Sequence, residues 1–479
     1  MKKKTVVIGL FEDSKKVKVN PSFDEKLELL IKRKQLKLGL GEVNKVPTFQ
    51  KDVELIWVVG LGKERDYDMK ALRKAASTIT SSLGEDFEVI VSTFLGKLNE
   101  EEGLKKLVLF ANDYNYVFDR YKSDKKENKK LDILWTTERS FKKAPLIINE
   151  YTNVSESINM TRDLINTPHC DLNSEDLAAF VKKTFKELNN PKVEVNVLGR
   201  KEVTELKMGA FLAVNKGSKY EPQLIHLKFM NNPESEEVLG LVGKGLTFDT
   251  GGYSLKPSQF INDMKMDMGG AATVLGAFRA AVMNNLKINL QLAVAATDNM
   301  VNEAAYLPDD IVTSMNGKTI EIISTDAEGR LTLADALTYI QKQGVTRVID
   351  MATLTGAVIY ALGHYTTGAF GNNKTFTNDI IKAGENELEE LWELPINDST
   401  KKGVKASKVA DLLNATGRSV PGAQAAAAFL QEFINKGIKW IHLDIAGTAF
   451  RGTPLYGEHP GATGECVKTL YQYFKQNSK

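Results

Sequence analysis

Residues Val238-Leu239-Gly240-Leu241-Val242-Gly243-Lys244-Gly245 open the part of the sequence that decides the fold. The short apolar run at 238–242 predicts a buried strand, and the glycines that follow it predict a turn. A small, apolar stretch at 270–283 predicts a buried helix, and 290–296 predicts a second strand. Strands that alternate with helices in this way are typical of a parallel or mixed sheet covered by helices on both faces.

The same alternation continues toward the C-terminus. The patterns predict strands at 318–325, 346–351 and 440–445, and helices at 332–341 and 423–434. We therefore expect residues 176–479 to form one α/β domain, with a mixed sheet flanked by helices.

The N-terminal part mixes short apolar runs with helical stretches rich in Lys and Glu. Apolar runs predict strands at 5–11, 54–60, 89–91 and 106–110. Residues 1–145 are therefore expected to form an accessory α/β domain, because chemistry-bearing residue types do not gather there. Residues 146–175 are expected to form a linker. Most of it is expected to be a helix, and this helix should stop at Asn166-Thr167-Pro168.

Composition narrows the setting in which the protein works. The chain has 479 residues, with 63 Lys and Arg against 61 Asp and Glu, a net charge of +2. Such a balance gives no support to a nucleic-acid or acidic-membrane partner. Two cysteines cannot build a disulfide scaffold, which favours a reducing compartment. The longest apolar run, 351–363, is shorter than the ~20 residues of a membrane span. We expect a soluble, cytoplasmic protein without a membrane partner.

Four carboxylates follow the predicted strands or begin the buried helix. Asp249 lies in the glycine-rich loop after the first strand, Asp267 precedes the buried helix, and Asp326 and Glu328 follow the strand at 318–325. Ligands of such sheets bind beyond the carboxyl ends of the strands, so we expect the four to converge there. Four like charges in one pocket need compensation, and two divalent cations would balance about −4.

The spacing of two of these acids favours a shared metal pair. In extended backbone, Asp326 and Glu328 at positions i and i+2 would point to the same side. Two ions that activate a water and stabilise an oxyanion suit hydrolysis, and oxygen ligands accept Mg, Mn or Zn. Lys256 could polarise a carbonyl or stabilise the oxyanion. The five histidines lie outside these segments, so a histidine-rich zinc site is not supported.

The segment around these acids resembles the cytosolic leucyl aminopeptidase family of metallopeptidases. Ser324-Thr325-Asp326-Ala327-Glu328-Gly329-Arg330-Leu331 is similar to the family signature Asn-Thr-Asp-Ala-Glu-Gly-Arg-Leu. The resemblance runs in order from about residue 160 to the C-terminus, and further matching segments are 242–252, 264–272, 352–357, 442–449 and 461–464. It implies a dinuclear metalloaminopeptidase that removes N-terminal residues, preferably Leu-like, from peptides.

The resemblance also implies a role for each matching residue. A tightly held metal would be bound by Lys244, Asp249, Asp267 and Glu328. An exchangeable metal would be bound by Asp249, Asp326 and Glu328, together with the backbone carbonyl of Asp326. Both ions would be Mn or Zn.

Two catalytic side chains and a substrate pocket complete the implied site. Arg330 would hold bicarbonate as a general base, and Lys256 would stabilise the gem-diolate. The carbonyl of Leu354 would position the substrate, and Met264, Thr353 and Gly356 would line the first side-chain pocket. Ser324 and Phe450 depart from the usual Asn and Trp of the family, but neither is at a ligand position.

At the level of the whole protein, the resemblance implies an N-terminal domain similar to a macro domain, a linker helix, a catalytic domain and a homohexamer. Two alternatives stay open. A two-metal phosphoesterase would share the carboxylates but would not predict a lysine ligand or an apolar pocket. A DNA-binding or regulatory role would appear as salt-dependent DNA retention.

Overall fold

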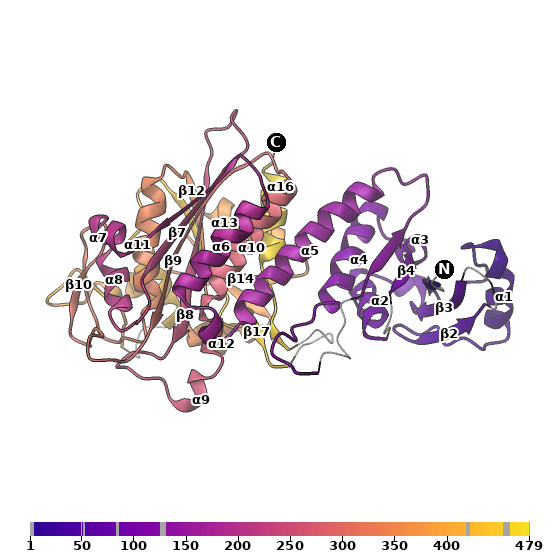
Figure 1. The fold of residues 1–479 in the computed structure, drawn as a ribbon, viewed down its shortest axis with the longest axis horizontal. Coiled ribbons are helices and arrows are strands. Elements are labelled where there is room, and N and C mark those ends of the chain that lie inside the picture. The colour runs from indigo at the N-terminus through magenta and orange to yellow at the C-terminus, as the bar shows by residue number, and fades with distance from the viewer. Residues whose placement is uncertain are drawn as a thin grey trace. The chain divides into compact units, whose positions relative to one another are not determined.

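The computed structural model describes residues 4–48, 50, 53–82, 86–124, 131–417, 422–453 and 460–478. It divides into two compact units, the first built mainly from residues up to Glu156 and the second mainly from Ser157 onward (Figure 1). Helix α5 (Ala144–Asn166) begins in the first unit and ends in the second. Among the described residues, there is no helix both long and apolar enough to cross a membrane.

The first unit is an α/β structure with a five-stranded sheet in the order β2-β3-β1-β4-β5. Its strands run parallel except for β2, which pairs antiparallel with β3. The strands are β1 (Lys4–Leu10), β2 (Val43–Pro47), β3 (Val53–Gly60), β4 (Phe87–Ile90) and β5 (Ile133–Thr136), and the helices are α1 (Pro21–Lys32), α2 (Met69–Ser82), α3 (Ser92–Leu95) and α4 (Glu100–Tyr114).

One strand predicted for this unit is wrong. Residues 106–110 lie in α4, which begins after Asn99, whose side chain accepts a hydrogen bond from the backbone N–H of Glu102. Every residue from Gly103 to Ala111 is buried, so the polar face that marks a surface helix is missing. A short apolar run is equally consistent with a buried strand and a buried helix, and the short length of this one favoured the strand.

The second unit contains the helices α6 to α16 and the strands β6 to β18. The helices are α6 (Ser174–Glu187), α7 (Arg200–Glu205), α8 (Gly209–Asn215), α9 (Ser258–Ile261), α10 (Gly269–Met283), α11 (Gly329–Lys342), α12 (Gly356–Leu362), α13 (Lys374–Asn386), α14 (Asp398–Val404), α15 (Gly422–Gln431) and α16 (Val467–Gln476). The strands are β6 (Val193–Leu198), β7 (Gln223–Met230), β8 (Leu239–Asp249), β9 (Asn289–Asn299), β10 (Ile311–Thr313), β11 (Thr319–Glu321), β12 (Arg347–Ala352), β13 (Thr366–Gly371), β14 (Glu390–Glu393), β15 (Leu412–Leu413), β16 (Lys439–Asp444), β17 (Phe450–Arg451) and β18 (Gly461–Ala462). Two short 3-10 helices matter below, η2 (His169–Asp171) and η3 (Met264–Met268).

The core of this unit is an eight-stranded mixed sheet in the order β14-β13-β16-β12-β8-β9-β7-β6. Its centre is parallel, because β12 pairs parallel with β16 and β8, and β8 pairs parallel with β9. The outer strands β13 and β7 join antiparallel. The predicted α/β class with a mixed sheet is therefore confirmed.

Helices bury both faces of the sheet (Figure 1). Along β8, Leu241 belongs to the apolar cluster that contains α10 and α16, and Val242 belongs to the cluster that contains α11 and α15. All eleven residues of β9 are buried, and its middle, from Leu292 to Ala296, is continuously apolar. A Cβ atom on Gly270 would lie 2.0 Å from the carbonyl oxygen of Met351, so this glycine allows α10 to pack directly on β12.

The predicted strand at 318–325 is only partly correct. The strand β11 covers three residues, and the chain turns away after Ile322. The edge strand pairing of β11 with β15 ends at Glu321 and Leu413, so residues 323–325 have no strand beside them to continue the ladder.

Candidate metal centre

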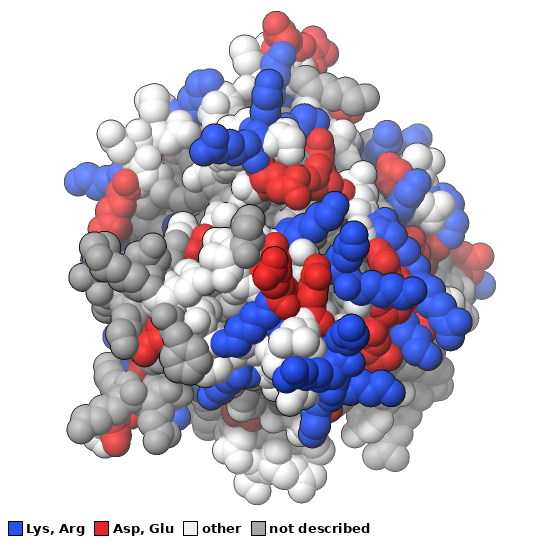
Figure 2. Space-filling view, turned by 90° about the vertical axis from the view of Figure 1, so that its right-hand side faces the viewer, with Lys and Arg blue, Asp and Glu red and all other residues white. Residues whose placement is uncertain are grey.

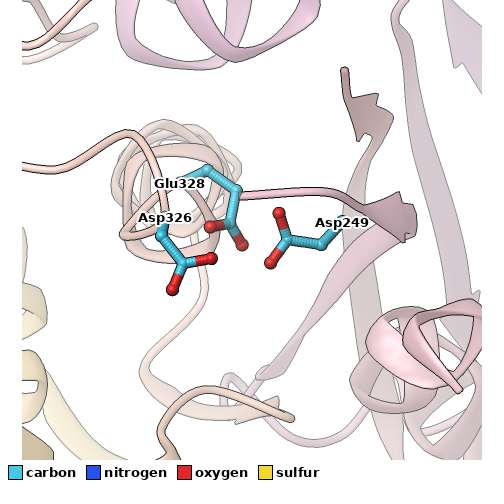
Figure 3. Close-up of side chains that lie close together, drawn as sticks. All are labelled: Asp249, Asp326 and Glu328. Carbon is cyan, nitrogen blue, oxygen red and sulfur yellow. The ribbon is translucent and has the colours of Figure 1, made fainter. Parts of the chain in front are cut away.

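One predicted acid ends a central parallel strand, and the other three lie in segments that lead into helices. Asp249 is the last residue of β8, Asp267 lies in η3 just before α10, and Glu328 is the residue directly before α11. Oxygen atoms of Asp249, Asp326 and Glu328 all lie within 4.8 Å of one another. Figure 3 shows the three carboxyl groups turned toward a common space, Asp249 from the strand and the other two from the segment that leads into the helix.

Asp326 and Glu328 do converge, but the prediction that extended backbone would bring them to the same side is wrong. Their segment is not extended, since Asp326 lies in a turn and Glu328 has right-handed helical backbone angles, φ −79° and ψ −37°. The turn into α11 brings the two carboxyl groups together, whereas strand alternation plays no part.

Two lysines lie between the carboxylates. The Lys244 amine is 2.7 Å from Oδ2 of Asp267 and 3.0 Å from Oε1 of Glu328, and it donates a hydrogen bond to the Thr353 carbonyl at 3.1 Å. The Lys256 amine is 2.8 Å from Oδ2 of Asp249 and also pairs with Asp326. The structure thus brings together Lys244, Lys256 and all four predicted acids.

Burial sets the protonation of this cluster. Desolvation raises the pKa of Glu328 to about 8 and that of Asp267 to about 6, against the opposing effect of Lys244. Burial alone would lower the pKa of Lys244, but the charges of Asp267, Glu328 and Asp249 raise it above its ordinary value. Without another cation, the site therefore favours the protonated forms of these two carboxyl groups and of the Lys244 amine.

The residues present fit divalent cations. Four carboxylates face two ammonium groups, so two negative charges lack a counterpart when all are ionised. The Oε2 atom of Glu328 is buried and has no hydrogen-bond partner among the described residues. An unpaired buried carboxylate oxygen is costly, and it is the ligand type that hard divalent ions prefer.

The other predicted residues surround this cluster. Thr353 donates a hydrogen bond to Oδ1 of Asp267 at 2.9 Å. Leu354 follows it between β12 and α12, and Gly356 is the first residue of α12. Met264 begins η3, the element that carries Asp267. Met264 therefore shares an element with Asp267, whereas Leu354 and Gly356 belong to the part of the chain that follows β12.

Arg330 lies in the first turn of α11, two residues after Glu328. Its side chain is buried, and burial lowers its pKa to about 10 against the charges of Glu328, Asp444 and Asp326. One guanidinium nitrogen donates to the Asn414 carbonyl at 2.7 Å, while Nε has no hydrogen-bond partner in the part of the chain that is described.

Sequence reasoning missed two residues that orient the acids. Asn299, at the end of β9, donates hydrogen bonds to Oδ1 of Asp249 at 2.8 Å and to the Thr325 carbonyl at 3.0 Å. Thr325 donates to the Gly251 carbonyl at 2.6 Å and accepts from the backbone N–H of Ser254 at 2.7 Å. The strand-end rule that found Asp249 applies equally to Asn299, so that signal was present in the sequence.

Comparison with known proteins places this arrangement among peptidases. Residues 159–471 match the model of the cytosol aminopeptidase family, catalytic domain, and residues 7–125 match the N-terminal domain of the same family. A probable cytosol aminopeptidase of Treponema denticola is 40% identical over 94% of this chain and 95% of its own length. One from Fusobacterium nucleatum is 39% identical over 98% and 95%.

A solved structure has the same fold. The bottromycin maturation enzyme BotP superimposes with a TM-score of 0.86 at 28% identity, covering 99% of both chains. The same enzyme has been solved in complex with Mn, again with a TM-score of 0.86, 28% identity and 99% of this chain covered, with 100% of that chain.

Proposed function

Because this chain belongs to the cytosol aminopeptidase family and is a metal-dependent aminopeptidase, we propose that it works as a dinuclear enzyme that removes Leu-like N-terminal residues from peptides. The single observation that carries the proposal is the convergence of Asp249, Asp326 and Glu328, together with Asp267, around two lysine amines. A phosphoesterase would have no use for a lysine among the ligands.

Two ions would share these ligands. Lys244, Asp249, Asp267 and Glu328 would hold the tightly bound ion, and Asp249, Asp326 and Glu328, with the Asp326 carbonyl, would hold the exchangeable one. Bound divalent ions, Mn or Zn, would supply a water of lowered pKa and polarise the scissile carbonyl. Lys244 would have to be a neutral amine to act as a ligand, and a cation reverses the effect that the carboxylates alone have on its pKa.

Lys256 and Arg330 would carry the polar chemistry of this chain. The Lys256 amine is near Asp249 and Asp326 and partly exposed, so it can donate to the oxyanion that forms at the substrate carbonyl. Arg330 keeps a buried N–H without a partner among the described residues, which suits an anion such as bicarbonate acting as general base.

The preference for Leu-like residues would come from Met264, Thr353 and Gly356, with the Leu354 carbonyl holding the substrate. A Cβ on Gly356 would meet no atom within 4 Å, so space is open beside this segment. An apolar lining with few polar groups is what an aliphatic side chain requires.

The assembly and setting stay part of the proposal. A homohexamer in the cytoplasm would restrict substrates to short or unfolded peptides. The proposed division places the accessory domain at 1–145, the linker at 146–175 and the catalytic domain at 176–479.

The test is leucine anilide hydrolysis by the full-length protein after chelator dialysis, and again after addition of Mn²⁺ or Zn²⁺. We expect activity to disappear with the metal and to return with one of the ions. A parallel assay with a phosphodiester substrate should stay at background.

Two outcomes would contradict the proposal. Folded, metal-loaded protein without peptidase activity would exclude an aminopeptidase of this specificity. Hydrolysis that survives complete metal removal would exclude the metal-based mechanism.

A further inference from the structure

A fully buried side-chain amide lies beside residues 323–328, the segment that carries Asp326 and Glu328 and is called the carboxylate segment below. Asn414 follows β15 and has none of its surface exposed. Its Oδ1 accepts hydrogen bonds from the backbone N–H groups of Ile323 at 2.8 Å and Ser324 at 3.3 Å. Its Nδ2 donates to the carbonyls of Ser324 at 2.7 Å and Ala327 at 3.4 Å. One side chain thus makes four contacts with the segment that carries Asp326.

The backbone of Asn414 connects this segment to two further groups. Its N–H donates to the Glu321 carbonyl at 3.0 Å, where β11 ends. Its carbonyl accepts from Arg330 at 2.7 Å. The same residue therefore fixes the start of the carboxylate segment and the buried guanidinium.

The hydrogen bonds of Asn414 replace the strand pairing that the sheet no longer provides after Glu321. After Glu321 the chain leaves the ladder, so the backbone groups of 323 and 324 need other partners. Asp326 and Glu328 repel each other and Asp249, and without a rigid support the segment would relieve that repulsion by spreading. The amide supplies the support.

We propose that Asn414 is a positioning residue that holds Asp326, Glu328 and Arg330 in register for metal binding and catalysis. This inference rests on the proposed function only for its catalytic part. Metal binding can be measured whatever reaction the protein catalyses.

The test variant is Asn414→Asp in the full-length protein. It keeps the size of the side chain and the acceptor, but it places a second oxygen against two carbonyls and leaves them unpaired. We expect Mn²⁺ to bind about 10- to 100-fold more weakly, as for other residues that orient metal ligands. We also expect kcat to fall while KM changes little, because the pocket residues lie on η3 and on the segment after β12.

Asn289, the first residue of β9, offers a matched control. It is also buried, its Oδ1 accepts from the N–H of Asn232 at 2.9 Å, and its Nδ2 donates to the carbonyls of Asn232 at 2.9 Å and Ser235 at 3.0 Å. Asn289→Asp introduces the same clash of oxygens without touching the site. We expect it to lower stability but to leave Mn²⁺ affinity and kcat as in the parent.

The measurement is a calorimetric Mn²⁺ titration of chelator-stripped protein, with amide hydrogen exchange at Ile323 and Ser324. Faster exchange at these two amides in Asn414→Asp, with weaker Mn²⁺ binding, supports the inference. Parent-like Mn²⁺ affinity in Asn414→Asp, or an equal loss in Asn289→Asp, overturns it. If Asn414→Asp fails to fold, Asn414→Ser is held to the same two criteria. A parent protein that binds Mn²⁺ but does not hydrolyse leucine anilide would refute the proposed function and leave this test intact.

Discussion

Glu328, like Asp249, is a proposed ligand of both metal ions. It is buried, its Oε1 lies 3.0 Å from the Lys244 amine, and its Oε2 has no partner among the described residues. Removing it would take away a ligand of both ions and leave Lys244 with fewer counter-charges. Few other single changes would affect the two ions at once.

We therefore expect Glu328→Ala to abolish leucine anilide hydrolysis, by at least about 1,000-fold, with the fold retained. Metal content by mass spectrometry of the desalted protein should fall for both ions. Glu389→Ala is the control, because Glu389 is another buried carboxylate of the same unit, paired with Lys468 and Thr469. Full activity in Glu328→Ala would remove this residue from the site.

For single residues, the sequence predicts the charged metal ligands better than the neutral side chains that hold them in place. Asp249, Asp267, Asp326 and Glu328 were predictable because acids that follow strands or begin a buried helix meet at one edge of the sheet and need a cation to coexist there. Asn414 was not, since a neutral amide after a two-residue strand, 86 residues beyond Glu328, has no electrostatic signature in the sequence. Its role depends on where the chain returns in space.

Among the elements, α11 makes room for the lysine of the neighbouring strand. A Cβ on Gly329 would lie 2.3 Å from Cε of Lys244 and 2.7 Å from its amine. The first residue of α11 is thus a glycine because the side chain from β8 passes directly over it. Contact with a flexible side chain, rather than with backbone, means that the lysine can yield.

We expect Gly329→Ala to leave the fold intact but to displace the Lys244 amine, weakening Mn²⁺ binding by about 10-fold or more. Calorimetric titration and the melting temperature of the metal-free protein separate the two effects. Gly199→Ala is a matched control, because Gly199 also lies at the start of a helix and its added Cβ meets only Glu202, at an ordinary 3.6 Å. Unchanged Mn²⁺ affinity in Gly329→Ala would mean that the position of the Lys244 amine does not matter for Mn²⁺ binding, and would contradict its role as a ligand.

Element prediction failed where burial hides periodicity or where side chains replace a ladder. The strand predicted at 106–110 is helix α4 because its residues are buried on every side. The strand predicted at 318–325 shortens to β11 because β15 ends beside it and Asn414 takes over the hydrogen bonds. Elsewhere, as at α10, β9 and β12, the patterns gave the right type of element. At β8 the type was right but the predicted end was wrong, because the strand continues through Gly243 and Gly245 to Asp249 instead of turning at the glycines.

At the scale of the whole molecule, all proposed metal ligands belong to one unit. They lie between Lys244 and Glu328, within the second of the two compact units. On the face displayed in Figure 2, Lys and Arg side chains are interleaved with Asp and Glu.

We expect Mn²⁺ to protect only the second unit from amide hydrogen exchange, because a ligand stabilises the unit that binds it. Exchange measured by mass spectrometry should slow in the segments around 244–256 and 323–330. The amides of β1, β3 and α4 serve as an internal reference and should exchange at the same rate with and without the ion. Equal protection of both units would show that they unfold together.

The parallel centre of the second sheet has a consequence for the order of events during synthesis. The ligand-bearing strand β8 pairs with β12, and β12 pairs with β16, which ends only at Asp444. All the ligands have been synthesised once Glu328 is made, yet the strands that fix them belong to the next hundred residues or so. A nascent or prematurely terminated chain would therefore expose the acids without the scaffold that turns them into a chelating pocket, and metal capture would report that translation has run almost to completion.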